Sequence, residues 1–251
     1  MNILVCVKRV PLTGGKIVLS DDQRAISTRH LGFTVSPHEE CGAEEAVRLI
    51  EQHGGSSVVL TLGPPEAEEQ LRDMMALGID RAIHLVTDGE EWDPQATADA
   101  IVDAIRGDPD EYDLILFGNE SADAGNYQVA IRVAHKLGLP VVTGIKGIAV
   151  SDGQLHLEQE VPGGRDVYVA PMPAVVTVKE GLNLPRYPSV PGRLRAKRKP
   201  LDTSTPVRPD AKLEMVKLTL PPGSGKQAEV LGNGADAAPA VVAMLDELGL
   251  L

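Results

Sequence analysis

The sequence predicts an α/β fold with a mostly parallel sheet that carries helices on both faces. Three observations predict it. Short apolar runs rich in β-branched residues recur up to about residue 140. Amphipathic stretches of helical length lie between these runs, and prolines or glycines mark their ends. Strands that are apolar on both sides and alternate with helices are typical of a parallel sheet buried between two helical layers.

The first predicted strand covers residues 2–10, and the polar residues 14–34 follow it as a hairpin or an excursion. Ser36 and Pro37 then suit the cap and the first turn of a helix, which Gly54 ends.

Further strands are predicted at residues 58–62, 82–86 and 113–117, and further helices at residues 66–77, 94–106 and 126–137. From residue 141 the alternation stops. Strands at residues 143–150, 155–161 and 174–178 follow one another without helices, which predicts an antiparallel addition to the sheet.

The chain is expected to divide after residue 200. Residues 1–200 would form a nucleotide-binding α/β domain, and residues 201–251 an extended C-terminal arm with a helix that packs on a partner subunit. Residues 200–234 are poor in core residues. They are expected either to be disordered or to lie on a partner. The final amphipathic helix is predicted at residues 237–248.

Composition argues against several classes of protein. The net charge of −12 argues against nucleic acid or an anionic membrane as the main partner, because both need a basic face. Two cysteines are too few for a disulfide framework, and no apolar run is long enough to span a membrane. We expect a cytoplasmic protein without direct membrane insertion.

The strongest chemical signal is the loop at residues 118–129, which follows a strand of the parallel sheet. Ligands bind past the carboxyl ends of such strands. Small residues let backbone approach a ligand, and a helix from Asn126 would point free amides at a phosphate. Asp123 is expected to cap that helix or to hold a ribose hydroxyl, and Gln128 to reach a phosphate oxygen. The alternative is an ordinary capped loop, since no glycine-rich nucleotide motif is present.

Catalytic constellations are missing from the sequence. The six histidines lack metal-ligand spacing, and Cys6 lies within an apolar strand, as an inert core thiol would. Only His38, at a helix start near the ligand edge, is a candidate for a site residue. The sequence therefore predicts a protein without bond-breaking chemistry of its own.

A proline-rich stretch at residues 182–191 precedes a run of Arg and Lys at residues 193–199. Three prolines fix the backbone and remove donors, so the stretch is predicted to contain neither a helix nor a central strand. A stiff loop with apolar residues beside a basic patch is typical of a surface that another protein grips. The alternative is a linker followed by solvated charges.

Five ordered motifs resemble the small (β) subunit of electron-transfer flavoprotein over residues 1–200. They are Val5–Val10, Ala43–Leu49, Ala76–His84, Gly118–Val129 and Asn183–Tyr187. The resemblance implies an adenine-nucleotide-hydrolase-like fold that no longer hydrolyses its ligand. It also implies a heterodimer with a larger α subunit, whose C-terminal domain holds the redox-active FAD.

In that family the β subunit binds a structural AMP, which a second FAD replaces in the electron-bifurcating branch. By position, the resemblance assigns cofactor contacts to Cys6, Ser36, Pro37, His38, Glu39, Leu62, Gly118, Asn119, Ser121, Asp123, Ala124, Gly125, Asn126, Tyr127, Gln128 and Val129. Val129 is typical of the bifurcating branch, whereas Tyr127 fits neither pattern. AMP is the preferred expectation.

The resemblance further implies that the proline-rich stretch docks acyl-CoA dehydrogenases and related flavin dehydrogenases. The implied docking residues are Leu184, Pro185, Arg186, Tyr187, Val190, Arg193, Arg195 and Lys197. Ser36-Pro37-His38 and Thr13 depart from the family pattern near the α-subunit flavin. A free-standing adenine-nucleotide-binding module of the stress-protein type is the alternative, although it leaves the proline-rich stretch unexplained. An ATP pyrophosphatase ranks last, because Lys8-Arg9-Val10-Pro11 is not a phosphate loop.

Overall fold

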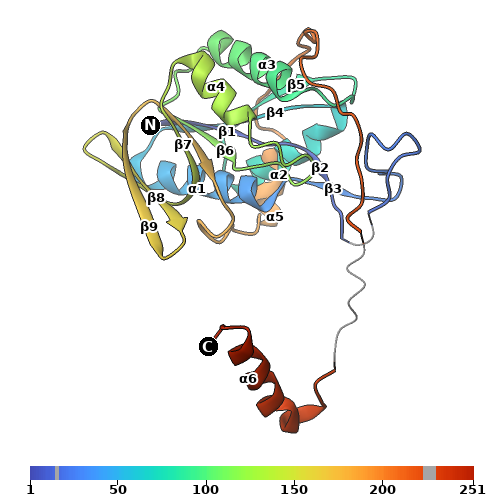
Figure 1. Cartoon of the computed structure of the whole chain (residues 1–251). Helices are drawn as coiled ribbons and strands as arrows, with labels where there is room; N and C mark the ends of the chain where they lie inside the picture. The colour runs from blue at the N-terminus through green and yellow to red at the C-terminus, as the bar shows by residue number, and fades with distance from the viewer. Residues whose placement is uncertain (15–16, 223–229) are drawn as a thin grey trace. The chain divides into compact units, whose positions relative to one another are not determined.

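The computed structural model describes residues 1–14, 17–222 and 230–251, and within them a large sheet runs through the protein (Figure 1). The strand order is β11-β5-β4-β1-β6-β10-β7-β8-β9. The strands are β1 (Asn2–Cys6), β4 (Ser56–Gly63), β5 (Arg81–Val86), β6 (Leu114–Gly118), β7 (Val141–Ser151), β8 (Gln154–Val161), β9 (Gly164–Pro171), β10 (Ala174–Val178) and β11 (Leu201–Ser204). The short strands β2 (Val10–Pro11) and β3 (Phe33–Thr34) form a separate antiparallel pair.

Strands β11 to β7 pair in parallel, whereas β7, β8 and β9 pair antiparallel. This arrangement confirms an α/β fold with a mostly parallel sheet and an antiparallel addition.

The helices cover the sheet on both faces. Helices α1 (Pro37–His53) and α2 (Glu68–Leu77) lie on one face, with α5 (Val190–Ala196) against α2, and α3 (Pro94–Gly107) and α4 (Val129–Leu137) lie on the other (Figure 1). Ile3 and Val5 belong to the core under α1 and α2, whereas Leu4 belongs to the core under α3 and α4. Because successive side chains point to opposite faces, a strand buried on both sides must be apolar throughout.

Helix α1 begins as the sequence predicts. Ser36 accepts a hydrogen bond from the Glu39 amide, and the Glu39 carboxylate accepts one from the Ser36 amide. This reciprocal capping box satisfies two amides that the helix itself leaves unpaired. The helix ends at Gly54, whose positive φ of 72° suits glycine.

Two predicted boundaries are wrong. The first strand ends at Cys6, and Val10 instead pairs with Thr34 at the base of the excursion. The helix predicted from Asn126 begins only at Val129. Tyr127 has a φ of 55°, in the left-handed region, and this conformation cannot continue into a right-handed helix.

Three further features differ from the sequence prediction. The proline-rich stretch leads into a helix, because Ser189 caps α5 and Pro191 occupies its first turn, where no amide is needed. Strands β9 and β11 were not predicted. Strand β11 pairs with β5 at one edge of the sheet, and β9 pairs with β8 at the other.

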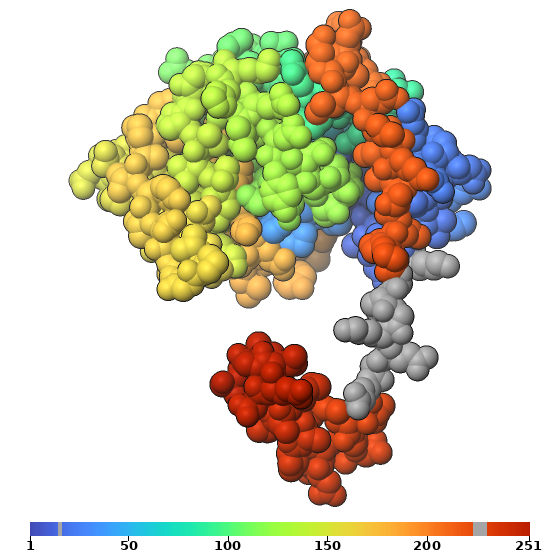
Figure 2. Space-filling view, in the orientation of Figure 1, coloured from blue at the N-terminus to red at the C-terminus, as the bar shows by residue number. Residues whose placement is uncertain are grey.

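The chain divides into two compact units, Met1–Val216 and Lys217–Leu251. Residues 201–216 therefore belong to the first unit, although the sequence placed them in the arm. Figure 2 shows the segment after β11, in orange, along the surface of this unit. Arg208 pairs with Glu90 there, and the amides of Lys212 and Leu213 donate to Asp93.

The second unit contains the short 3₁₀ helix η2 (Gly234–Ala237) and helix α6 (Ala238–Glu247), close to the predicted helix at residues 237–248. Another 3₁₀ turn, η1 (Pro65–Ala67), precedes α2 in the first unit. Among the described helices, none is both long and apolar enough to cross a membrane.

Candidate functional site

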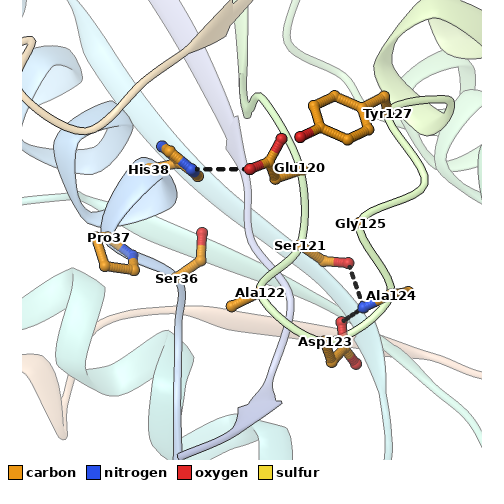
Figure 3. Close-up of a pocket in the computed structure, with 10 residues that line it drawn as sticks. All are labelled: Ser36, Pro37, His38, Glu120, Ser121, Ala122, Asp123, Ala124, Gly125 and Tyr127. Atoms are coloured by element: carbon orange, nitrogen blue, oxygen red, sulfur yellow. Dashed lines mark hydrogen bonds and ion pairs between the residues drawn. The ribbon is translucent and has the colours of Figure 1, made fainter. Parts of the chain in front are cut away.

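A pocket of about 360 Å³ lies at the carboxyl edge of the parallel strands, between the start of α1 and the loop after β6 (Figure 3). Its lining residues are Ser36, Pro37, His38, Glu120, Ser121, Ala122, Asp123, Ala124, Gly125 and Tyr127. Two segments more than 80 residues apart in sequence thus form one site. They meet because β1 and β6 are parallel neighbours, so the segments that follow both strands emerge at the same edge.

His38 forms the α1 side of the pocket. Its Nδ1 atom accepts a hydrogen bond of 2.7 Å from the backbone amide of Glu180. An accepting Nδ1 places the proton of the neutral ring on Nε2. Nε2 lies 3.5 Å from a carboxylate oxygen of Glu120, and Figure 3 shows the two side chains turned toward each other.

The opposite side is a loop that folds back on itself. The Ala124 amide donates to Asp123 Oδ1 and to Ser121 Oγ, and the Gly125 amide donates to the Ser121 carbonyl. Gly125 and Tyr127 both have left-handed backbone conformations, which turn the chain back toward α4. Because Ala122, Ala124 and Gly125 are small, a ligand can approach the backbone of this loop closely.

Lys8, just after β1, forms an ion pair with the loop through Asp123. Its ammonium group lies 2.6 Å from Glu91 and 2.8 Å from Asp123. Burial alone would raise the pKa of Asp123, but the charge and hydrogen bond of Lys8, together with hydrogen bonds from Ser121 and the Ala124 amide, outweigh it and lower this pKa. Burial opposes the charge on Lys8 as well, yet the two carboxylates raise its pKa. Both groups therefore stay charged and hold the loop to the end of β1.

Glu39 lies buried beneath the pocket. Its carboxylate accepts hydrogen bonds from the amides of Lys8 and Ser36, at 3.1 and 3.2 Å. Burial nevertheless raises the pKa of Glu39 to about 8. Gly118 provides the room for this side chain, because a Cβ there would lie 2.7 Å from the Glu39 Cγ.

The pocket gathers only part of the predicted cofactor set. Predicted residues that line it are Ser36, Pro37, His38, Ser121, Asp123, Ala124, Gly125 and Tyr127. Predicted residues outside its lining are Cys6, Glu39, Leu62, Gly118, Asn119, Asn126, Gln128 and Val129.

The helix-capping role expected of Asp123 is not found, and a contact between Gln128 and a phosphate stays a prediction. Asp123 pairs with Lys8 and does not cap α4, which has no side-chain cap. The Gln128 side chain accepts hydrogen bonds from Arg132 and does not line the pocket.

Glu120 and Ala122 also line the pocket, in addition to the predicted contacts. Both lie within the loop at residues 118–129, which the sequence marks as a ligand loop as a whole. The two cysteines are buried free thiols, and burial, followed by the nearby Glu39, raises the pKa of Cys6. No group of three or more metal-ligating side chains occurs among the described residues.

The predicted docking residues lie on another surface, in the segment from residue 182 to residue 199, which we call the docking segment. Leu184, Tyr187 and Val190 are 84%, 97% and 72% exposed. Arg193 pairs with Asp73, whereas Arg195 and Lys197 are exposed. Three large apolar side chains in seven residues therefore face solvent beside a basic run.

Comparisons with known proteins show the family of the chain. A family model described as "Electron transfer flavoprotein domain" matches residues 25–208. An electron transfer flavoprotein subunit beta of Bacillus subtilis (strain 168) is 34% identical over 254 residues, which cover 98% of this chain and 97% of that protein. A protein of the same description from Syntrophomonas wolfei is 35% identical over 223 residues, 88% of this chain and 86% of that protein. The chain belongs to the electron transfer flavoprotein family and is similar to its beta subunits over most of its length.

Proposed function

We propose that the chain is the β subunit of a heterodimeric electron-transfer flavoprotein and serves as part of an electron carrier. It binds a structural AMP in the pocket, completes the FAD site of an α subunit and docks flavin dehydrogenases through the docking segment. The observation that carries the proposal is the pocket at the carboxyl edge of the sheet, in a chain that belongs to this family.

The dimensions and chemistry of the pocket fit a mononucleotide. Its volume of about 360 Å³ is near the lower end of the range for small-molecule sites, roughly 300–1,000 Å³. The lining offers the Ser121 hydroxyl and the carboxylates of Glu120 and Asp123, which suit ribose hydroxyls or the adenine amino group. No Lys or Arg lines it among the described residues, so a phosphate would rest on loop amides other than those of Ala124 and Gly125, which donate within the loop. A second FAD is larger and carries a pyrophosphate, and this setting therefore favours AMP.

The redox chemistry would come from the FAD that the α subunit holds, since flavins exchange the electrons and the protein binds and orients them. The part of this chain would be to present one wall of that flavin's site and to bring a dehydrogenase close.

The exposed side chains of Leu184, Tyr187 and Val190 support the docking role. Isolated exposed apolar residues are ordinary, but a cluster on a proline-stiffened segment is typical of a site that binds another protein. A carrier must also release its partner after each transfer. A small anchor with a basic rim suits a transient complex of that kind.

Nucleotide content tests the proposal most directly. The chain would be co-expressed with its α subunit, the complex denatured, and the released FAD and AMP quantified. One FAD and one AMP per heterodimer are expected. Two FADs without AMP would assign the pocket to a second flavin, as in the bifurcating branch. A monomer that binds an adenine nucleotide and never flavin would instead support the stress-type module and overturn the proposal.

A further inference from the structure

Arg186, in the docking segment, lies against α1 with its side chain 36% exposed. Its guanidinium donates to both carboxylate oxygens of Glu51, at 2.7 and 3.0 Å. It also donates to both oxygens of Glu44, at 2.9 and 3.2 Å. The backbone amide of Arg186 adds a further hydrogen bond to Glu44 at 3.1 Å. The guanidinium is therefore hydrogen-bonded to two carboxylates at once.

Glu44 is the buried half of this arrangement, since its side chain is 2% exposed. Burial of a carboxylate is unfavourable unless charged and hydrogen-bonding partners compensate for the lost water. Arg186 and Arg48 supply those partners, and Arg48 donates to Glu44 over 2.9 Å. The buried Glu44 carboxylate therefore favours the conformation in which the docking segment lies on α1.

Asn183 attaches the docking segment to α1 a second time. Its side-chain amide donates to Glu45 at 2.8 Å and to the Cys41 carbonyl at 3.0 Å. On α1, Glu44 and Glu45 lie three and four positions after Cys41, and Glu51 lies seven positions after Glu44, so the contacted residues follow one side of the helix. We call Asn183 and Arg186 with Glu44, Glu45 and Glu51 the α1 clamp.

Leu184 and Tyr187 alternate with the two clamped residues and remain almost fully exposed. Asn183 and Arg186 thus bind α1, while the apolar side chains of Leu184 and Tyr187 stay accessible to a partner. We propose that Arg186 is a positioning residue, which holds the docking segment in its binding conformation before a dehydrogenase arrives. This inference rests on the proposed docking function and reassigns Arg186, which the sequence suggested as a contact of the partner.

The α1 clamp would act by preorganisation. A segment that is already ordered loses little conformational entropy on binding, so the partner is bound more tightly without any added contact. Loosening the clamp should therefore raise the KM for the carrier and leave kcat unchanged. A direct contact that forms only in the complex would not affect the free protein at all.

Limited proteolysis of the complete α–β complex tests the clamp without any dehydrogenase. Trypsin must take the Arg186 side chain into its own specificity pocket, which the clamp prevents. The Glu51→Gln variant removes one charge-assisted pair, and cleavage after Arg186 is expected to accelerate about tenfold relative to cleavage after Lys217. Glu44→Gln should give a larger effect, and Glu51→Gln keeps the test usable if the buried change prevents folding.

The same variants then serve as electron acceptors from an acyl-CoA dehydrogenase reduced by its substrate. Glu51→Gln and Arg186→Lys should raise KM for the carrier with kcat unchanged, because lysine keeps the charge but lacks the guanidinium fork. Asp73→Asn is the matched control. It removes the exposed partner of Arg193 in the same segment, and should change neither cleavage after Arg186 nor KM.

Three outcomes would overturn the inference. The first is unchanged cleavage after Arg186 in both glutamate variants. The second is an Asp73→Asn variant that behaves like Glu51→Gln, since general surface charge would then be the cause. The third is faster cleavage with unaltered KM. In this third outcome Val190→Asp decides what fails. A raised KM in Val190→Asp would overturn only the positioning role of Arg186. An unaltered KM in Val190→Asp would overturn the proposed docking function as well.

Discussion

The backbone amide of Glu180 donates a hydrogen bond to Nδ1 of His38 across 2.7 Å. This bond connects the wall of the pocket to the stretch that leads from β10 into the docking segment. It requires an unprotonated Nδ1, so the pocket presents a neutral ring with its proton on Nε2.

The His38–Glu180 bond can be tested with two substitutions at one position. His38→Asn retains a side-chain acceptor at a similar distance from the backbone, whereas His38→Ala removes it. Amide hydrogen exchange at Glu180 should therefore accelerate in His38→Ala and stay close to wild type in His38→Asn. The stability difference between the variants should be about 1 kcal/mol. Equal exchange rates in both would show that the bond contributes nothing to the order of this stretch.

Val190→Asp should impair electron acceptance from a dehydrogenase and leave FAD and AMP content intact. Val190 is 72% exposed at the start of α5, where an acidic residue is compatible with the helix dipole. The change therefore replaces an apolar anchor by a charge without a folding penalty. Val207→Asp, at a 92% exposed position outside the docking segment, is the control. Transfer rates at wild-type level in Val190→Asp would contradict the docking proposal.

Glu39 should make the protein less stable as the pH rises. Its pKa is raised to about 8 in the folded protein, above the usual value of 4.5. The stabilising effect of its protonated form is complete below the unfolded pKa and is lost between pH 4.5 and pH 8. The slope from this one group is at most about 1.4 kcal/mol per pH unit.

Denaturant unfolding at several pH values, with wild type and Glu39→Gln compared, checks this slope. The amide is neutral throughout, so the free energy of unfolding of wild type should fall relative to that of the variant as pH increases. The variant also loses one acceptor for the amides of Lys8 and Ser36, which lowers its stability at every pH. The test is therefore the difference between the two slopes of unfolding free energy against pH. Parallel curves for wild type and Glu39→Gln would mean that Glu39 does not titrate in this range.

Gly118→Ala should destabilise the floor of the pocket. A Cβ at this position would lie 2.7 Å from the Glu39 Cγ and 3.3 Å from the His38 Cβ, so the start of α1 would have to move. Overpacking of this kind costs about 1–3 kcal/mol, and the AMP content should fall with it. Gly107→Ala, where a Cβ meets open space, should shift stability by less than about 0.5 kcal/mol. Thermal unfolding and released nucleotide are the measurements.

Lys199→Met should lower the stability of the first unit by about 1–3 kcal/mol. The Lys199 ammonium donates to the carbonyls of Met75, Gly78 and Ile79, in the last turn of α2 and directly after it. The bond therefore attaches the end of the docking segment to α2. Lys197→Met, at an exposed position two residues earlier, is the control in urea unfolding. Equal midpoints for the two variants would contradict this role.

Much of the fold was predictable because it follows from local periodicity. The apolar runs that became β1, β4, β5 and β6 must be buried on both faces, and the capping residues Ser36 and Glu39 marked the start of α1 within the sequence itself. Strand β11 could not be predicted in this way. It is short and mostly exposed, and it is a strand only because β5 offers it an edge to pair with.

The loop of the candidate site was predictable, and eight of the predicted residues line the pocket, but the contacts within the loop were not predictable. Residues 118–129 stand out because a small-residue loop follows a buried strand. The left-handed conformation of Tyr127 delays α4 by three residues, and the pairing of Asp123 with Lys8 takes away the role of helix cap. The second of these depends on where the end of β1 lies, which strand order decides.

The sequence by itself determined the layered α/β architecture, the family and the two surfaces proposed to bind ligand and partner, since each rests on residues close together in the chain. Tertiary structure alone decided which groups face one another: His38 and Glu120 across the pocket, and Arg186 against Glu44 and Glu51 on α1. The physical reason is that hydrogen bonds and ion pairs act over about 3 Å in space. Their partners here lie about 80 to 140 residues apart, and only the strand order of the sheet brings them together.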